Sequence, residues 1–173
     1  MIGAVGRFVR AVKDGKTPYW LSLLGTSGAG KTYLAKRIWN WYHTSDLFQA
    51  TMSRDHSGRQ QILYPGQWCY WPSVAAQLSA GEGYEILSEL ASEKFIVLDE
   101  IGSDRDPSGN IRNGLARTLC SRVGKWTIVT SNKTLQQVGD DIDNRIASRM
   151  CRDGSQVVEV DIPDYSVVQR TKS

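Results

Sequence analysis

One eight-residue segment has the residue types and spacing of a loop that binds phosphate groups. Gly25-Thr-Ser-Gly-Ala-Gly-Lys-Thr32 matches G-x-x-x-x-G-K-[ST] in full, between an expected strand and an expected helix. Glycines let main-chain N–H groups surround a phosphate, and the helix start adds partial positive charge. We expect Lys31 to reach the β- and γ-phosphates and Thr32 to bind Mg²⁺. The alternative is a glycine-rich turn without a ligand. The residues of this glycine loop are Gly25, Thr26, Ser27, Gly28, Ala29, Gly30, Lys31 and Thr32.

Two adjacent carboxylates, Asp99 and Glu100, follow the apolar run Phe95-Ile-Val-Leu98. Ligands of open α/β sheets bind at the carboxyl ends of the strands. We therefore expect Asp99 to hold Mg²⁺ through water and Glu100 to polarise a water for attack on the γ-phosphate. The alternative is a pair of strand-end acids that face solvent.

Asn132 ends another apolar run, Trp126-Thr-Ile-Val-Thr130. It could orient the attacking water or contact the γ-phosphate as a polar sensor. It could equally be a turn residue, since asparagine is common at strand ends. Spacing alone favours neither interpretation.

Asp141, Arg145 and Arg149 follow one another at intervals of four residues, which predicts one face of one helix. Spacing alone favours a surface ladder of charge pairs, each worth a few tenths of a kcal/mol. The other interpretation is an arginine finger that reaches the ATP of a neighbouring subunit.

Short strands that alternate with helices predict an α/β fold with a parallel sheet. We expect five strands, near residues 19–24, 67–71, 95–99, 126–130 and 157–162. The helices are expected near residues 2–13, 31–43, 72–80 and 84–92, around Ile111-Leu115-Leu119, and as one helix through Val138, Ile142 and Ile146. Residues 44–66 lack clear periodicity and predict a long loop or insertion that could include a short hairpin.

Composition and charge exclude several classes of protein. The chain has 173 residues, 40% hydrophobic and 23% charged, as expected of one globular domain. No apolar run is long enough to span a bilayer, and no secretory segment is present. Three widely spaced cysteines favour a reducing, cytoplasmic setting without a disulfide framework or a zinc site.

The net charge of +3 permits contact with nucleic acid, but no single basic stripe dominates. Five cations flank one predicted helix, which is typical of a solvated face: Arg105, Arg112, Arg117, Arg122 and Lys125.

The order of these motifs resembles that of the AAA+ ATPases of the DnaC/IstB type, which include bacterial and phage helicase loaders. The glycine loop is followed by Val-Leu-Asp-Glu-Ile-Gly102, Thr-Ile-Val-Thr-Ser-Asn132 and Asn-Arg-Ile-Ala-Ser-Arg-Met150. The similarity runs from about Phe8 to Tyr165. The last two blocks are its specific part, because the glycine loop alone fits many families.

The resemblance implies a P-loop NTPase fold with an AAA+ core, and the alternation of strands and helices predicts helices on both faces of the sheet. The chain departs from the family pattern because it stops soon after the last strand, so we expect no C-terminal lid domain. It also implies that Asn132 is the polar sensor and that Arg149 is the arginine finger acting in trans, with Arg145 beside it. A finger in trans requires a homo-oligomer, either a ring or a spiral. Proteins of this kind bind single-stranded DNA and deliver a replicative helicase onto it.

We therefore expect an N-terminal amphipathic helix over residues 1–18 and an ATPase core over 19–173. The cofactors are ATP and Mg²⁺, and the function is helicase loading in DNA replication, without contact to a membrane. The chain end soon after the last strand suggests a minimal, phage-encoded form. Only about 18 residues precede the first strand, where loaders usually carry a region that grips the helicase. An IstB-like ATPase that serves a transposase is the nearest alternative. A P-loop nucleotide kinase and an ATP-gated adaptor without turnover are the others.

Overall fold

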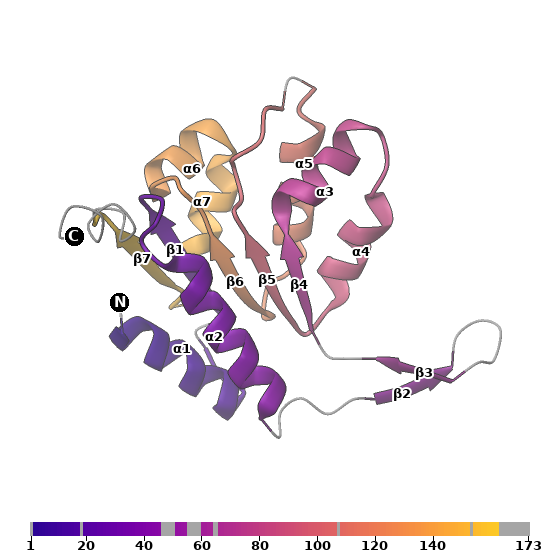
Figure 1. Cartoon of the computed structure of the whole chain (residues 1–173), viewed down its shortest axis with the longest axis vertical. Coiled ribbons are helices and arrows are strands. Elements are labelled where there is room, and N and C mark those ends of the chain that lie inside the picture. Colours follow the sequence, from indigo (N-terminus) through magenta and orange to yellow (C-terminus); the bar gives the residue numbers. More distant parts are fainter. Residues whose placement is uncertain are drawn as a thin grey trace, which may run out of the picture.

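A five-stranded parallel sheet is the centre of the protein in the computed structural model (Figure 1). The structure describes residues 2–17, 19–45, 51–54, 60–63, 66–106, 108–152 and 154–162. The strands of the sheet are β1 (Trp20–Gly25), β4 (Gln67–Tyr70), β5 (Phe95–Asp99), β6 (Trp126–Thr130) and β7 (Gln156–Val160). Their spatial order is β4-β5-β6-β1-β7. The expected α/β fold and all five expected strands are confirmed.

Helices cover both faces of this sheet, as expected. On one face, α1 (Ile2–Asp14) and α2 (Lys31–Thr44) pack against side chains such as Phe95 and Val97 of β5. On the other, α3 (Trp71–Ser79), α4 (Tyr84–Ser92) and α5 (Asn110–Cys120) pack against the alternate side chains, Ile96 and Leu98. Successive side chains of a strand point to opposite faces, so β5 has to be apolar throughout. Among the described residues, no helix is both long enough and apolar enough to cross a membrane.

An antiparallel hairpin is inserted between α2 and β4, within the segment for which a loop or a short hairpin was expected. Its strands are β2 (Thr51–Arg54) and β3 (Gln60–Leu63). Figure 1 shows that the hairpin projects away from the five-stranded sheet and is not a part of it. The remainder of the segment, 46–50, 55–59 and 64–65, lies outside the described residues.

The single helix expected through Val138, Ile142 and Ile146 is wrong. The structure has two short helices there, α6 (Leu135–Asp141) and α7 (Asn144–Met150). Asp143 separates them in extended backbone, and its carboxylate accepts a hydrogen bond from the N–H of Arg145. An aspartate in this position caps a new helix and so ends the old one. The three apolar side chains still share one core, because Val138, Ile142 and Ile146 are all buried in it.

Arg122 is fully buried, so the solvated face expected for the cations around α5 is wrong at this position. Its guanidinium donates to the carbonyl oxygens of Leu90, Glu93 and Trp126 and to the hydroxyl of Thr127, at 2.5 to 2.9 Å. Burial lowers the pKa of this guanidinium. The four acceptors offset part of the cost of removing the charge from water. Arg122 therefore joins the end of α4 to the start of β6 and serves the fold.

Candidate nucleotide-binding site

The glycine loop leaves the carboxyl end of β1 in a conformation that requires glycine. Gly25 has φ +112°, and a Cβ there would lie 2.1 Å from the carbonyl oxygen of Val160 in β7. Gly30, directly before α2, has φ +79° in the left-handed region. Thr26 fixes the loop to β7, because its N–H donates to the Val160 carbonyl oxygen at 3.0 Å. The loop is thus held by its own strand and by the neighbouring strand.

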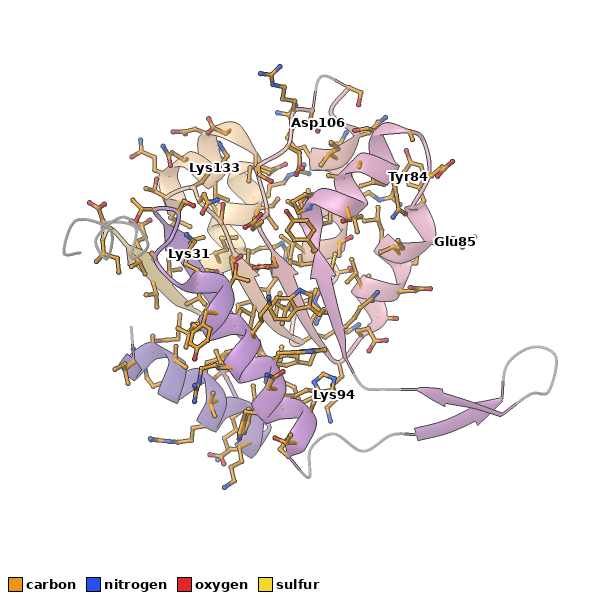
Figure 2. All side chains as sticks on the ribbon, viewed as in Figure 1. Lys31, Tyr84, Glu85, Lys94, Asp106 and Lys133 are labelled. Atoms are coloured by element: carbon orange, nitrogen blue, oxygen red, sulfur yellow. The ribbon has the colours of Figure 1, made fainter. Side chains whose placement is uncertain are left out.

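Lys31 lies inside this loop, at the start of α2 (Figure 2). Its ammonium group donates to the carbonyl oxygens of Gly25 (2.9 Å) and Thr26 (2.6 Å) and to Oδ1 of Asn132 (3.0 Å). Burial lowers the pKa of Lys31, and the carboxylates of Glu100 and Asp99 oppose that shift. A cation that is held by neutral oxygens in a partly dehydrated loop is well placed to attract an anion.

Thr32 and Asp99 meet beside the lysine. The Thr32 hydroxyl donates to Oδ1 of Asp99 at 2.9 Å, and the Thr130 hydroxyl donates to the same oxygen at 2.7 Å. Asp99 is only 4% exposed, so it is not a strand-end acid that faces solvent. Thr130 is the last residue of β6, the strand beside β5. A hydroxyl and a carboxylate at one point are oxygen ligands of the kind that Mg²⁺ prefers.

Glu100 follows Asp99 in a strained backbone conformation. Its φ of +63° is the only positive value among the described residues other than glycine. Such a conformation costs about 1–3 kcal/mol and is found mostly at functional sites. The N–H of Glu100 donates to the Thr130 hydroxyl oxygen at 2.9 Å, which helps to hold this geometry. The Tyr70 hydroxyl donates to Oε2 of Glu100 at 3.2 Å, and this hydrogen bond raises the pKa of Tyr70.

The strand order brings these groups together. Because β6 lies between β5 and β1, the ends of these three strands are neighbours at one edge of the sheet. Asn132 follows β6 and reaches Lys31, so its position is that of a site residue rather than of a remote turn. Seven residues that the sequence singled out for this site lie in or around one cavity: Ser27, Gly28, Gly30, Lys31, Thr32, Glu100 and Asn132.

Asp141, Arg145 and Arg149 do not form the expected ladder of charge pairs. Asp141 ends α6 and pairs with Lys133 at 2.7 Å, whereas Arg145 pairs with Asp143 at 2.7 Å. The cause is the helix break at Asp143, since only one continuous helix would align the three side chains. The Arg149 guanidinium makes no hydrogen bond or ion pair with any residue that the structure describes.

Arg149 is also remote from the glycine loop of its own chain. It lines a small cavity with Tyr19 and Trp20, which stand at the amino end of β1. The glycine loop leaves the opposite end of that strand. The structure therefore does not bring Arg149 into the cavity that holds Lys31.

Thr130 and Tyr70 contact the site, but sequence reasoning gave them no role. Thr130 stands in the Thr-Ser-Asn segment and could have been noticed as a hydroxyl at a strand end. Its two hydrogen bonds to the acidic pair depend on the pairing of β5 with β6. Tyr70 ends β4, the other neighbour of β5, and no local sequence signal marks it.

These residues fit a nucleotide triphosphate with Mg²⁺. The main chain of the loop has a conformation that a Cβ at Gly25 would not allow. The ammonium group of Lys31 already donates to three oxygen atoms. The polyphosphate would lie against the loop and Lys31, and the cation beside Thr32 and Asp99. The fit supports the expected ligands ATP and Mg²⁺ by the chemistry of the donor groups.

The sequence matches no protein-family model and no curated protein. Solved structures do match the fold. The crystal structure of DnaI has a TM-score of 0.71 at 22% identity and covers 92% of this chain and 84% of its own. The crystal structure of the DnaC helicase loader has a TM-score of 0.65 at 18% identity and covers 91% and 86%.

The replication initiator DnaA, solved with AMPPCP and single-stranded DNA, has a TM-score of 0.64 at 17% identity. It covers 96% of this chain, which spans about half of that protein. The chain therefore shares the fold of these solved structures. The resemblance to AAA+ ATPases of the DnaC type that its motifs indicated is confirmed for the fold.

Proposed function

We propose that the protein is an ATPase of DNA replication that assembles through ATP and loads a replicative helicase onto single-stranded DNA. The observation that carries the ATPase is the connected set of hydrogen bonds from Lys31 to Asn132 and from Thr32 through Asp99 to Thr130. The folds of DnaI and of the DnaC helicase loader support a role in replication. Single-stranded DNA is proposed because DnaA was solved with it.

Each site residue has a distinct role in this proposal. Lys31 and the loop N–H groups bind and orient the β- and γ-phosphates. Thr32 and Asp99 hold Mg²⁺, which neutralises negative charge on the phosphate oxygens when it is bound. The free carboxylate oxygen of Glu100, Oε1, takes the proton of the attacking water, while Tyr70 holds Oε2. Asn132 orients that water or contacts the γ-phosphate.

Arg149 is proposed as the arginine finger in trans, and Arg145 as its neighbour. Two features support this choice. Arg145 is occupied by Asp143, whereas the Arg149 guanidinium has no partner among the described residues. Arg149 also lies away from the glycine loop of its own chain, so only a neighbouring subunit could receive it. This requires a homo-oligomer in the form of a ring or a spiral.

Turnover measurements test these roles. We expect Glu100→Gln to bind ATP but lose turnover by at least about 100-fold, the usual scale for a general base. Arg149→Ala should lose turnover by a comparable or larger factor, since arginine fingers contribute about 10³-fold or more. Mixing the two variants should restore part of the turnover, because each supplies what the other lacks. Equal rates in the wild type and both variants would refute the roles.

The function is tested separately from the chemistry. Glu100→Gln, held with ATP, should retain a replicative helicase when it is purified from host cells. Retention of a transposase would favour the IstB-like alternative. Phosphoryl transfer to a nucleoside, in place of phosphate release, would favour the nucleotide kinase. ATP-dependent assembly without any turnover would favour the adaptor.

A further inference from the structure

The fold gathers cations from two helices onto one face of the molecule. Helices α1 and α2 lie in one layer, because Phe8 of α1 and Tyr42 of α2 both pack against the ring of Phe95, at 6.2 and 4.4 Å between ring centroids. Figure 1 shows the two helices side by side. We name their outer surface the basic face. Its exposed cations come from α1, the turn after it and α2, and are Arg7, Arg10, Lys13, Lys16, Lys36 and Arg37.

The net positive charge of the chain is concentrated on the basic face. Its six cations stand beside a single exposed carboxylate, Asp14. The chain has 21 Lys and Arg against 18 Asp and Glu, so the rest of it is slightly acidic. None of the six cations forms an ion pair with a residue that the structure describes. Linear spacing hid this concentration, since α1 and α2 are separate in the sequence.

The basic face also presents an aromatic ring. Tyr33 is 64% exposed on α2, and the Arg37 guanidinium lies 5.9 Å from its ring centroid and donates to its hydroxyl at 3.2 Å. Tyr33, Lys36, Arg37 and Asn40 line one shallow hollow. Cations that track a phosphate backbone, together with an aromatic ring on which a base can stack, are typical of surfaces that bind single strands.

We infer that the basic face binds the backbone of single-stranded nucleic acid, with Tyr33 as a stacking platform. The inference rests on the proposed function for the choice of a single strand, and it adds the location of the contact. An anionic membrane is the less favoured partner. An amphipathic helix binds a bilayer through its apolar side, and the apolar residues Phe8 and Val12 of α1 are fully buried in the core.

Two matched quadruple variants test the inference, without nucleotide and with a fluorescent 25-nucleotide oligo-dT. The first changes Arg10, Lys13, Lys36 and Arg37 to glutamine. The control changes four exposed cations on other surfaces to glutamine: Arg105, Arg112, Arg117 and Arg152. Both lose the same charge. If two of the four cations contact phosphates at a time, the basic-face variant should bind about 20-fold more weakly at 100 mM salt, with a salt slope shallower by about 1.4.

A second pair tests the aromatic ring. Tyr33→Leu should weaken binding of oligo-dT by at least about fivefold. Tyr84→Leu should leave it unchanged, because Tyr84 is similarly exposed, at 50%, but lies on α4 on the other face of the sheet (Figure 2). ATP turnover without DNA should be unaffected in the basic-face quadruple variant, which shows that it is folded.

The inference is overturned if both quadruple variants lose affinity equally, or if the basic-face variant binds oligo-dT like the wild type. It is also overturned if the basic-face variant keeps its oligonucleotide affinity but loses binding to vesicles that contain anionic lipid. Failure of the proposed function has a different signature: the wild type would then show no phosphate release from ATP, or would retain a transposase in place of a helicase, whatever the oligonucleotide results.

Discussion

A methyl group at Gly25 tests whether the glycine loop depends on its contact with β7. In Gly25→Ala the new Cβ would lie 2.1 Å from the Val160 carbonyl oxygen, at a backbone φ of +112°. The oxygen has to retreat by about 1 Å, because protein interiors do not tolerate so short a contact. That oxygen accepts the N–H of Thr26 at 3.0 Å and the Thr26 hydroxyl at 3.3 Å, so the same movement breaks the two hydrogen bonds that join Thr26 to β7.

The cost can be added from these parts. Backbone strain at this φ contributes about 1–3 kcal/mol, and each lost hydrogen bond about 1 kcal/mol. We expect the free energy of unfolding to fall by about 3–5 kcal/mol, which lowers Tm by roughly 6–20 °C in a domain of this size. Because the loop leaves its cradle position, affinity for a fluorescent ATP analogue should fall by at least about tenfold, the equivalent of 1.4 kcal/mol.

Two glycines with the same sign of φ provide the controls. Gly15 (φ +67°) and Gly30 (φ +79°) have nothing within 4 Å of an added Cβ. Alanine at either position should lower the free energy of unfolding by about 1–2 kcal/mol, because only the left-handed backbone conformation opposes the added Cβ. Thermal melting is measured on all three variants. Analogue binding is compared between Gly25→Ala and Gly15→Ala, because Gly30 itself lines the nucleotide cavity. If Gly25→Ala melts and binds like Gly15→Ala, the contact with β7 does not support the loop and the reasoning is wrong.

Three further predictions concern the fold. Arg122→Met leaves buried carbonyl oxygens without a hydrogen-bond donor. It should therefore lower the free energy of unfolding, measured by urea titration, by about 3–5 kcal/mol. The control Arg117→Met changes an exposed arginine and should unfold within about 0.5 kcal/mol of the wild type. Thr134→Ala removes the capping box of α6 and should cost about 1 kcal/mol, seen as a Tm lower by about 2–4 °C; an unchanged Tm would contradict the cap. Burial raises the pKa of Cys69 to about 12, whereas Cys151 is exposed. A thiol reagent at pH 8 should therefore label Cys151 well before Cys69. Labelling in the reverse order would be incompatible with this packing.

Much of the fold could be predicted because each element carries a local signal. Strands buried on both faces read as apolar runs, as in 95–99 and 126–130, and all five were found. The break between α6 and α7 could not be read in this way. Val138, Ile142 and Ile146 keep a spacing of four whether the helix continues or restarts, and only the backbone at Asp143 shows that it restarts.

The site could be predicted where it is one continuous segment and not where it depends on neighbouring strands. The glycine loop and the acidic pair are local patterns, and their members do meet. Thr130 acquires its contacts only because β6 lies beside β5, and the positive φ of Glu100 leaves no trace in its residue type. The concentration of charge on the basic face likewise exists only once α1 and α2 share a layer.

Residues 130–133 show why the sheet order matters as much as the glycine loop. Thr130 holds the acidic pair of β5, Asn132 accepts from Lys31, and the carbonyl oxygen of Lys133 accepts the N–H of Gly25 at 3.2 Å. One segment thus joins the ends of β5, β6 and β1. Each bond is worth only about 1 kcal/mol, so no single one fixes the geometry. Their convergence requires β6 to stand between the other two strands. A chain with the same loop sequence but another strand order would lack the sensor amide and the hydroxyl that positions the acids.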